Sequence, residues 1–126
     1  VFGYSRSYAS LEQIQGTGTD PRSDLYSLAA TLYHLLVGMP PTDALTRAMM
    51  VLNGEADPLR AAHQIQSAVP VELSEVLLRA MALNANHRPT SAAAMRQMLI
   101  EAREQIGAEN LEATSAAPVS IFTQNT

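Results

Sequence analysis

The stretch that decides the fold is Asp24-Leu25-Tyr26-Ser27-Leu28-Ala29-Ala30-Thr31-Leu32-Tyr33-His34-Leu35-Leu36-Val37. It predicts one helix, about 21 Å long at a rise of 1.5 Å per residue. Pro21 and Ser23 mark its start, and Gly38 followed by Pro40-Pro41 marks its end. Apolar residues occupy nearly every side, and a helix without a polar face is buried all round. We therefore expect this helix to form the centre of the fold.

The composition limits what the chain can do. Its 126 residues, 47% of them hydrophobic, suffice for one domain with one core. The formal net charge of −4 provides no basic surface for nucleic acid, so no nucleic-acid partner is expected. No apolar run is long enough to span a bilayer. The lack of cysteine excludes disulfides and thiolate chemistry. The lack of cysteine and the lack of a visible signal peptide together predict a cytoplasmic protein.

Three further amphipathic helices are predicted, at about 43–53, 70–83 and 91–106. The helix at 43–53 carries an apolar stripe that we expect to face the core: Leu45, Ala48, Met49 and Leu52. Met50 and Val51 lie off this stripe. No strand pattern persists anywhere in the sequence, so the predicted fold class is all-α.

The end of the sequence differs from the rest. Residues 107–126 are rich in serine, threonine, alanine and asparagine and show no periodicity. We therefore predict a disordered tail at 107–126, following a folded region at 1–106. The first residue is Val1 rather than methionine, so we expect the chain to be a piece of a longer protein.

Local patterns alone indicate little chemistry. The run Gly16-Thr17-Gly18 lacks the third glycine, the preceding strand and the lysine of a phosphate-binding loop, so a turn is the better interpretation. His34, His63 and His87 share no metal-ligand spacing, and no metal site is predicted. His34 lies in the central helix, where a hydrogen-bonded core histidine is more common than a metal ligand.

Four runs appear in an order and at a spacing typical of one family. They are Tyr8-Ala9-Ser10-Leu11-Glu12-Gln13, Asp20-Pro21-Arg22-Ser23-Asp24-Leu25-Tyr26-Ser27-Leu28, Gly38-Met39-Pro40-Pro41 and His87-Arg88-Pro89-Thr90-Ser91-Ala92. Over residues 3–103 the chain resembles the C-terminal lobe of a bacterial eukaryotic-like serine/threonine protein kinase. The resemblance implies an all-α partial kinase C-lobe, with helices packed around one central buried helix.

The resemblance also implies roles for individual residues. Glu12 matches the glutamate that closes the activation segment, and Arg88 matches the arginine that pairs with it. A bidentate carboxylate–guanidinium pair explains why these two residue types are needed. Asp24 matches the aspartate that holds the backbone of the catalytic loop. Ser5 matches the threonine of the substrate-binding loop, and Arg6 follows it in that loop.

The helix at 43–53 matches helix G of the family, on which kinases often dock partners. Met50 and Val51 are the candidate docking residues, although packing in the core explains them equally well.

The motifs of the phosphate-transfer chemistry are not in this sequence. It has no glycine-rich loop, strand lysine, H-R-D catalytic loop or D-F-G motif. We therefore expect no catalytic residue and no bound cofactor in this chain, with ATP and Mg²⁺ implied only for a full-length parent. That parent would phosphorylate serine or threonine in a protein substrate. The chain alone would be inactive without the N-terminal part of the kinase domain.

The sequence leaves two other interpretations open. The first is a non-catalytic, kinase-like helical module that binds partners. The second is an unrelated helical bundle, which the joint spacing of the motifs disfavours.

Overall fold

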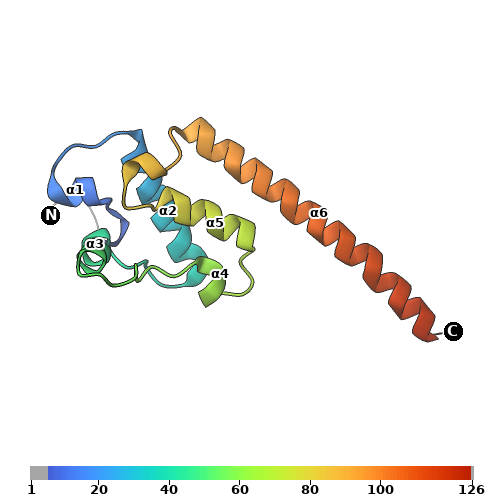
Figure 1. The fold of residues 1–126 in the computed structure, drawn as a ribbon. Helices are drawn as coiled ribbons and strands as arrows, with labels where there is room; N and C mark the ends of the chain where they lie inside the picture. Colours follow the sequence, from blue (N-terminus) through green and yellow to red (C-terminus); the bar gives the residue numbers. More distant parts are fainter. Residues whose placement is uncertain (1–5, 126) are drawn as a thin grey trace.

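The computed structural model describes residues 6–125, with side chains described through residue 113. The described part contains helices and no strand (Figure 1). In chain order the elements are η1 (Arg6–Tyr8), α1 (Leu11–Gln15), α2 (Pro21–Val37), α3 (Ala44–Leu52), α4 (Ala62–Ile65), α5 (Val71–Ala80), η2 (Ala85–His87) and α6 (Ala92–Asn125). None of the helices in this part is both long and apolar enough to cross a membrane.

Helix α2 begins three residues before the predicted stretch because Asp20 caps it. The carboxylate of Asp20 accepts hydrogen bonds from the backbone N–H groups of Arg22 and Ser23, and Pro21 occupies the first turn. The helix ends at Gly38, whose φ of +88° favours glycine over any other residue. The sequence signals for both ends are therefore present as capping contacts.

The core forms where α5 packs on α2 and α6 packs on α5 (Figure 1). Helix α2 supplies its largest buried group of side chains: Leu25, Tyr26, Ala29, Ala30 and Tyr33. Facing them are buried residues of the later helices and the segment after α5: Val76, Leu77, Ala80, Met81 and Met95. The helices thus pack around α2.

One side of α2, however, is open. Leu28 is 49% exposed and Leu35 is 75% exposed, and Asp24 and Thr31 on the same face are also exposed. These four positions follow the spacing of one helical face. The prediction that the helix is buried on all sides is therefore wrong for this chain, because none of its described elements covers that face.

Helix α3 buries a different face from the predicted one, because Leu45 and Ala48 of the predicted stripe are only half-buried and its other two members are exposed. Met49 is 56% exposed and Leu52 is 85% exposed, whereas Ala44 and Arg47 are buried. The predicted stripe is therefore wrong, since it placed Met49 and Leu52 in the core. The physical reason is that Arg47, the only charged residue of α3, finds hydrogen-bonding partners inside the protein.

Helix α6 runs on past the predicted end at Ile106 and extends away from the other helices (Figure 1). Gly107 does not adopt a positive φ and so does not terminate the helix. Residues 107–113 are helical but exposed throughout. The predicted helix end is wrong, while a division of the chain into a folded region and a tail stays a prediction.

Candidate functional site

The candidate site is built around an ion pair between two residues that lie 76 positions apart. Glu12 is in α1, which begins with a capping box formed by Ser10 and Gln13. Arg88 directly follows η2. Its Nη1 lies 2.6 Å from Oε2 of Glu12, and its Nη2 lies 3.0 Å from Oε1. The pair is bidentate, which is the strong geometry for a guanidinium and a carboxylate.

Arg88 is buried, and all five of its N–H donors have acceptors. Two bind Glu12; the other three bind backbone carbonyls, at 2.8 Å to Ala82, 3.1 Å to Leu83 and 3.4 Å to Arg22. The guanidinium also lies over the ring of Tyr26, 5.1 Å from its centroid. Arg88 therefore joins α1, the start of α2 and the segment after α5.

The carboxylate of Glu12 has a second partner and a shifted pKa. The hydroxyl of Ser23 donates to Oε2 at 2.6 Å. Burial by itself would raise the pKa of Glu12, but the hydrogen bonds from Arg88 and Ser23, with the charge of Arg88, outweigh it. They lower the pKa from 4.5 to about 2. Glu12 is thus held as a carboxylate at any ordinary pH.

This shift predicts an acid-sensitive fold. Because the pKa of Glu12 is lower in the native state than in the unfolded chain, its contribution is complete above pH 4.5 and is lost as pH falls toward 2. We expect this loss to be about 1–3 kcal/mol, allowing for the partial exposure of the carboxylate. Urea unfolding between pH 6 and pH 2.5 measures it. Glu12→Gln should have a shallower pH slope than wild type, and equal slopes would contradict the assignment.

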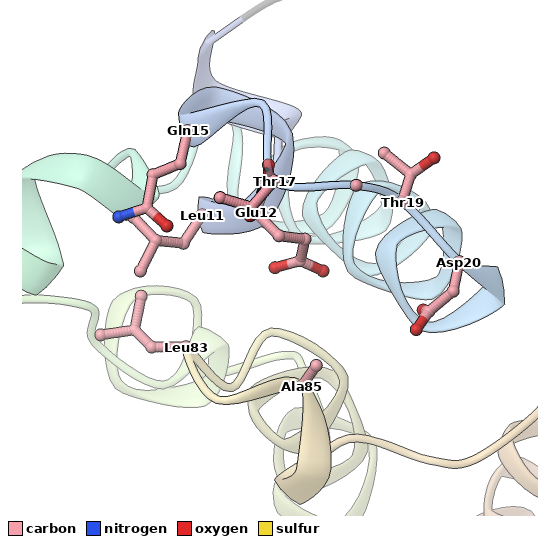
Figure 2. A pocket seen from close by; sticks show the side chains of 9 residues that line it. Leu11, Glu12, Gln15, Thr17, Thr19, Asp20, Leu83 and Ala85 are labelled. Carbon is pink, nitrogen blue, oxygen red and sulfur yellow. Dashed lines mark hydrogen bonds between the residues drawn. The ribbon is translucent and has the colours of Figure 1, made fainter.

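A hollow of about 470 Å³ lies beside the ion pair. Figure 2 shows Leu11 and Glu12 on one side of it and Leu83 and Ala85 on the other. The loop at 17–20 closes one end, after Gly16 turns the chain with φ of +70°. The lining contains the carboxylates of Glu12 and Asp20 and no basic side chain. The hollow therefore offers a phosphate group no cation, which favours the interpretation of the glycine run as a turn.

The other predicted site residues lie apart from the ion pair. Asp24 is in the first turn of α2 and exposed, on the open face of that helix. Arg6 is in η1, with its side chain 64% exposed and 3.9 Å from Asp43. Ser5 lies outside the described residues.

The two candidate docking residues differ in exposure. Val51 is 45% exposed, whereas Met50 is half-buried. The more exposed apolar residues of α3 are their neighbours Met49 and Leu52. The outward surface of α3 is therefore apolar, but Met50 is not its centre.

His34 has the hydrogen-bonding partner that was expected, but it is half-buried rather than part of the core. The hydroxyl of Tyr8 lies 2.5 Å from its Nδ1, and the two rings stack with centroids 5.9 Å apart. This contact fastens η1 to α2. Among the described residues, no group of three or more His, Cys, Asp or Glu side chains could hold a metal ion.

Sequence reasoning missed three residues in and beside the ion pair. Ser23 binds Glu12 directly, Tyr26 lies under Arg88, and Arg47 binds the hydroxyl of Tyr26. A signal existed only for Arg47, because it is the sole charge in α3. Ser23 and Tyr26 gave none, since a serine in a first turn and a tyrosine in an apolar helix are ordinary.

Comparisons with known proteins find sequence relatives of this chain, although no protein-family model matches it. The DNA damage-responsive serine/threonine-protein kinase RqkA of Deinococcus radiodurans is 34% identical over 100 residues, which are 79% of this chain. The serine/threonine-protein kinase PknB of Mycolicibacterium smegmatis is 38% identical over 98 residues, or 77% of this chain. This chain is a homologue of bacterial serine/threonine protein kinases.

A solved structure agrees with the sequence relatives. PpkA-294 in its apo form superposes with a TM-score of 0.64 and 28% identity over 75% of this chain. The prediction of an all-α partial kinase C-lobe is confirmed. The chain spans only 15% of the length of RqkA, 16% of PknB and 31% of the solved chain.

Proposed function

We propose that the chain is the substrate-side part of a serine/threonine protein kinase domain. The whole protein would transfer the γ-phosphate of ATP to a serine or threonine hydroxyl of a protein substrate. The observation that carries the proposal is the bidentate pair of Glu12 and Arg88. It stands at the two positions where the kinase resemblance requires a glutamate and an arginine.

In this proposal the chain holds the activation segment and the substrate-binding loop in place and contributes no catalytic residue. Glu12 and Arg88 fix the end of the activation segment against the body of the lobe. Ser5 and Arg6, a few residues earlier, belong to the loop that receives the substrate. The contact between Tyr8 and His34 supports this assignment, because it holds the segment that follows the loop on α2.

The open face of α2 fits the same proposal. It presents Asp24 at one end and the exposed side chains of Leu28 and Leu35 further along. Large apolar side chains grouped on one exposed helix face are typical of a surface that another part of a protein covers. We propose that the N-terminal part of the kinase domain covers them, with its catalytic loop bound by Asp24.

The experiment is to read the coding sequence that precedes Val1 and to express the longer protein. An H-R-D and a D-F-G motif upstream, with transfer of phosphate from ATP to serine or threonine of casein, would support the kinase proposal. Asp24→Asn in that protein should lower kcat, whereas Arg96→Lys on the exposed side of α6 should not. A longer protein that lacks both motifs would contradict it.

In that event the alternative is a kinase-like module that binds partner proteins. The observation that favours it is the orientation of α3, which presents Met49 and Leu52 outward. The reading of the upstream sequence therefore separates the two functions.

We also expect the 126-residue chain to show no measurable binding of ATP with Mg²⁺. Tight binding needs a phosphate-cradling loop, a lysine and a metal-binding aspartate, and the sequence contains none of these kinase motifs. Isothermal titration calorimetry measures the binding directly. Saturable binding at micromolar ATP would contradict this prediction.

A further inference from the structure

The inward face of α3 carries a second buried arginine, which makes four hydrogen bonds. Arg47 is 3% exposed. Its Nε and Nη2 donate to the two carboxylate oxygens of Asp57, at 2.9 and 2.8 Å. Its Nη1 donates to the hydroxyl of Tyr26 at 3.0 Å and to the carbonyl of Met81 at 2.8 Å. One side chain thus ties α3 to α2, to the end of α5 and to the loop after α3.

Tyr26 connects this arginine to the candidate site. It is completely buried, its ring lies below the guanidinium of Arg88, and its hydroxyl accepts a hydrogen bond from Arg47. The two arginines therefore contact the same tyrosine, Arg88 over the face of its ring and Arg47 at its hydroxyl. Arg47, Tyr26, Arg88 and Glu12 form a continuous row of side chains from α3 to α1.

The partners in this row depend on one another. Every buried side-chain nitrogen or oxygen in the described part of the protein has a hydrogen-bond partner. Buried polar networks are favourable only when each member is satisfied, because an unpaired group loses its hydration without compensation. A change at Arg47 therefore leaves the hydroxyl of Tyr26 without its donor. The ring can then move from its place below Arg88.

We propose that Arg47 is a positioning residue for the ion pair of Glu12 and Arg88, and that it acts through Tyr26. Arg47 shares no hydrogen bond or ion pair with Glu12, since Tyr26 and Arg88 lie between them. The inference rests on the proposed function only where it identifies Glu12 as the end of an activation segment. The coupling itself is a property of this chain and is measured without any kinase activity.

The test is a double-mutant cycle in the 126-residue chain, read from urea unfolding at pH 7. Arg47→Lys keeps the charge but loses the planar fork that binds Asp57 and Tyr26 together. Combined with Glu12→Gln, it should give a coupling of about fivefold or more in the unfolding equilibrium constant. Arg96→Lys, the same change at an exposed site, should be additive with Glu12→Gln. Additive behaviour of Arg47→Lys would overturn the proposal.

Tyr26→Phe separates a relay through the tyrosine from other routes. It keeps an aromatic ring in the core and removes only the hydroxyl that Arg47 binds, so the ring loses the contact that fixes its place below Arg88. We expect the ¹³C shift of the Glu12 carboxyl carbon at pH 7 to move in both Tyr26→Phe and Arg47→Lys, and not in Arg96→Lys. A movement in only one of the first two would overturn the relay. If Arg47→Lys does not fold, an unchanged ¹³C shift of Glu12 in Tyr26→Phe would by itself overturn the relay.

Discussion

Arg88→Met is expected to lower the free energy of unfolding by about 3–5 kcal/mol at pH 7. The substitution keeps an aliphatic side chain of similar length but removes all five hydrogen bonds of the guanidinium. The carboxylate of Glu12 then lacks its cation. The backbone carbonyls of Ala82 and Leu83 lose the hydrogen bonds that Arg88 donates to them. Urea unfolding followed by circular dichroism measures the change. It is large compared with the total free energy of unfolding of an ordinary domain, about 5–15 kcal/mol.

Two further variants sharpen this experiment. Arg88→Lys should recover little of the loss, because an ammonium cannot reproduce the planar, bidentate contact with Glu12. Arg103→Met, on the exposed side of α6, should leave the unfolding curve unchanged. A loss below about 1 kcal/mol for Arg88→Met would mean that the pair behaves as a solvated surface contact.

The second large effect is expected at the centre of the core. Leu77 of α5 is completely buried in the cluster that packs on α2. Leu77→Ala should therefore lower the free energy of unfolding by about 2–5 kcal/mol, through lost burial and the cavity that remains. The same urea experiment measures it.

Leu52→Ala is the matched control, because the same chemical change is made at a leucine of α3 that is 85% exposed. It should leave the stability of the chain unchanged. A comparable loss in both variants would contradict the outward orientation of α3. Equal and negligible losses would contradict the core assigned to α5.

The parts of the fold that the sequence predicts well are those fixed by local chemistry. Pro21 lies in the first turn of α2, Ser23 belongs to its capping box and Gly38 ends it, each through contacts within a few residues. These contacts form wherever the helix forms, so their residue types are visible in the sequence. The ion pair was different. Nothing periodic links Glu12 to Arg88, and only the resemblance to kinases indicated that the two residues meet.

The faces of the helices were harder to predict than their ends. An apolar stripe predicts the buried side only when hydrophobic burial decides the orientation, and in α3 the contacts of Arg47 decide it instead. The open side of α2 has another cause. Its leucines suit a buried helix, but the described residues contain no element that covers them.

The separation of 76 positions from Glu12 to Arg88 has a consequence for the time course of folding. Closing so long a loop costs more chain entropy than forming the local turns and helices, so this contact is expected to be made late. An interaction absent from the transition state affects chiefly the rate at which the native state is lost. The ion pair would then slow unfolding without speeding up folding.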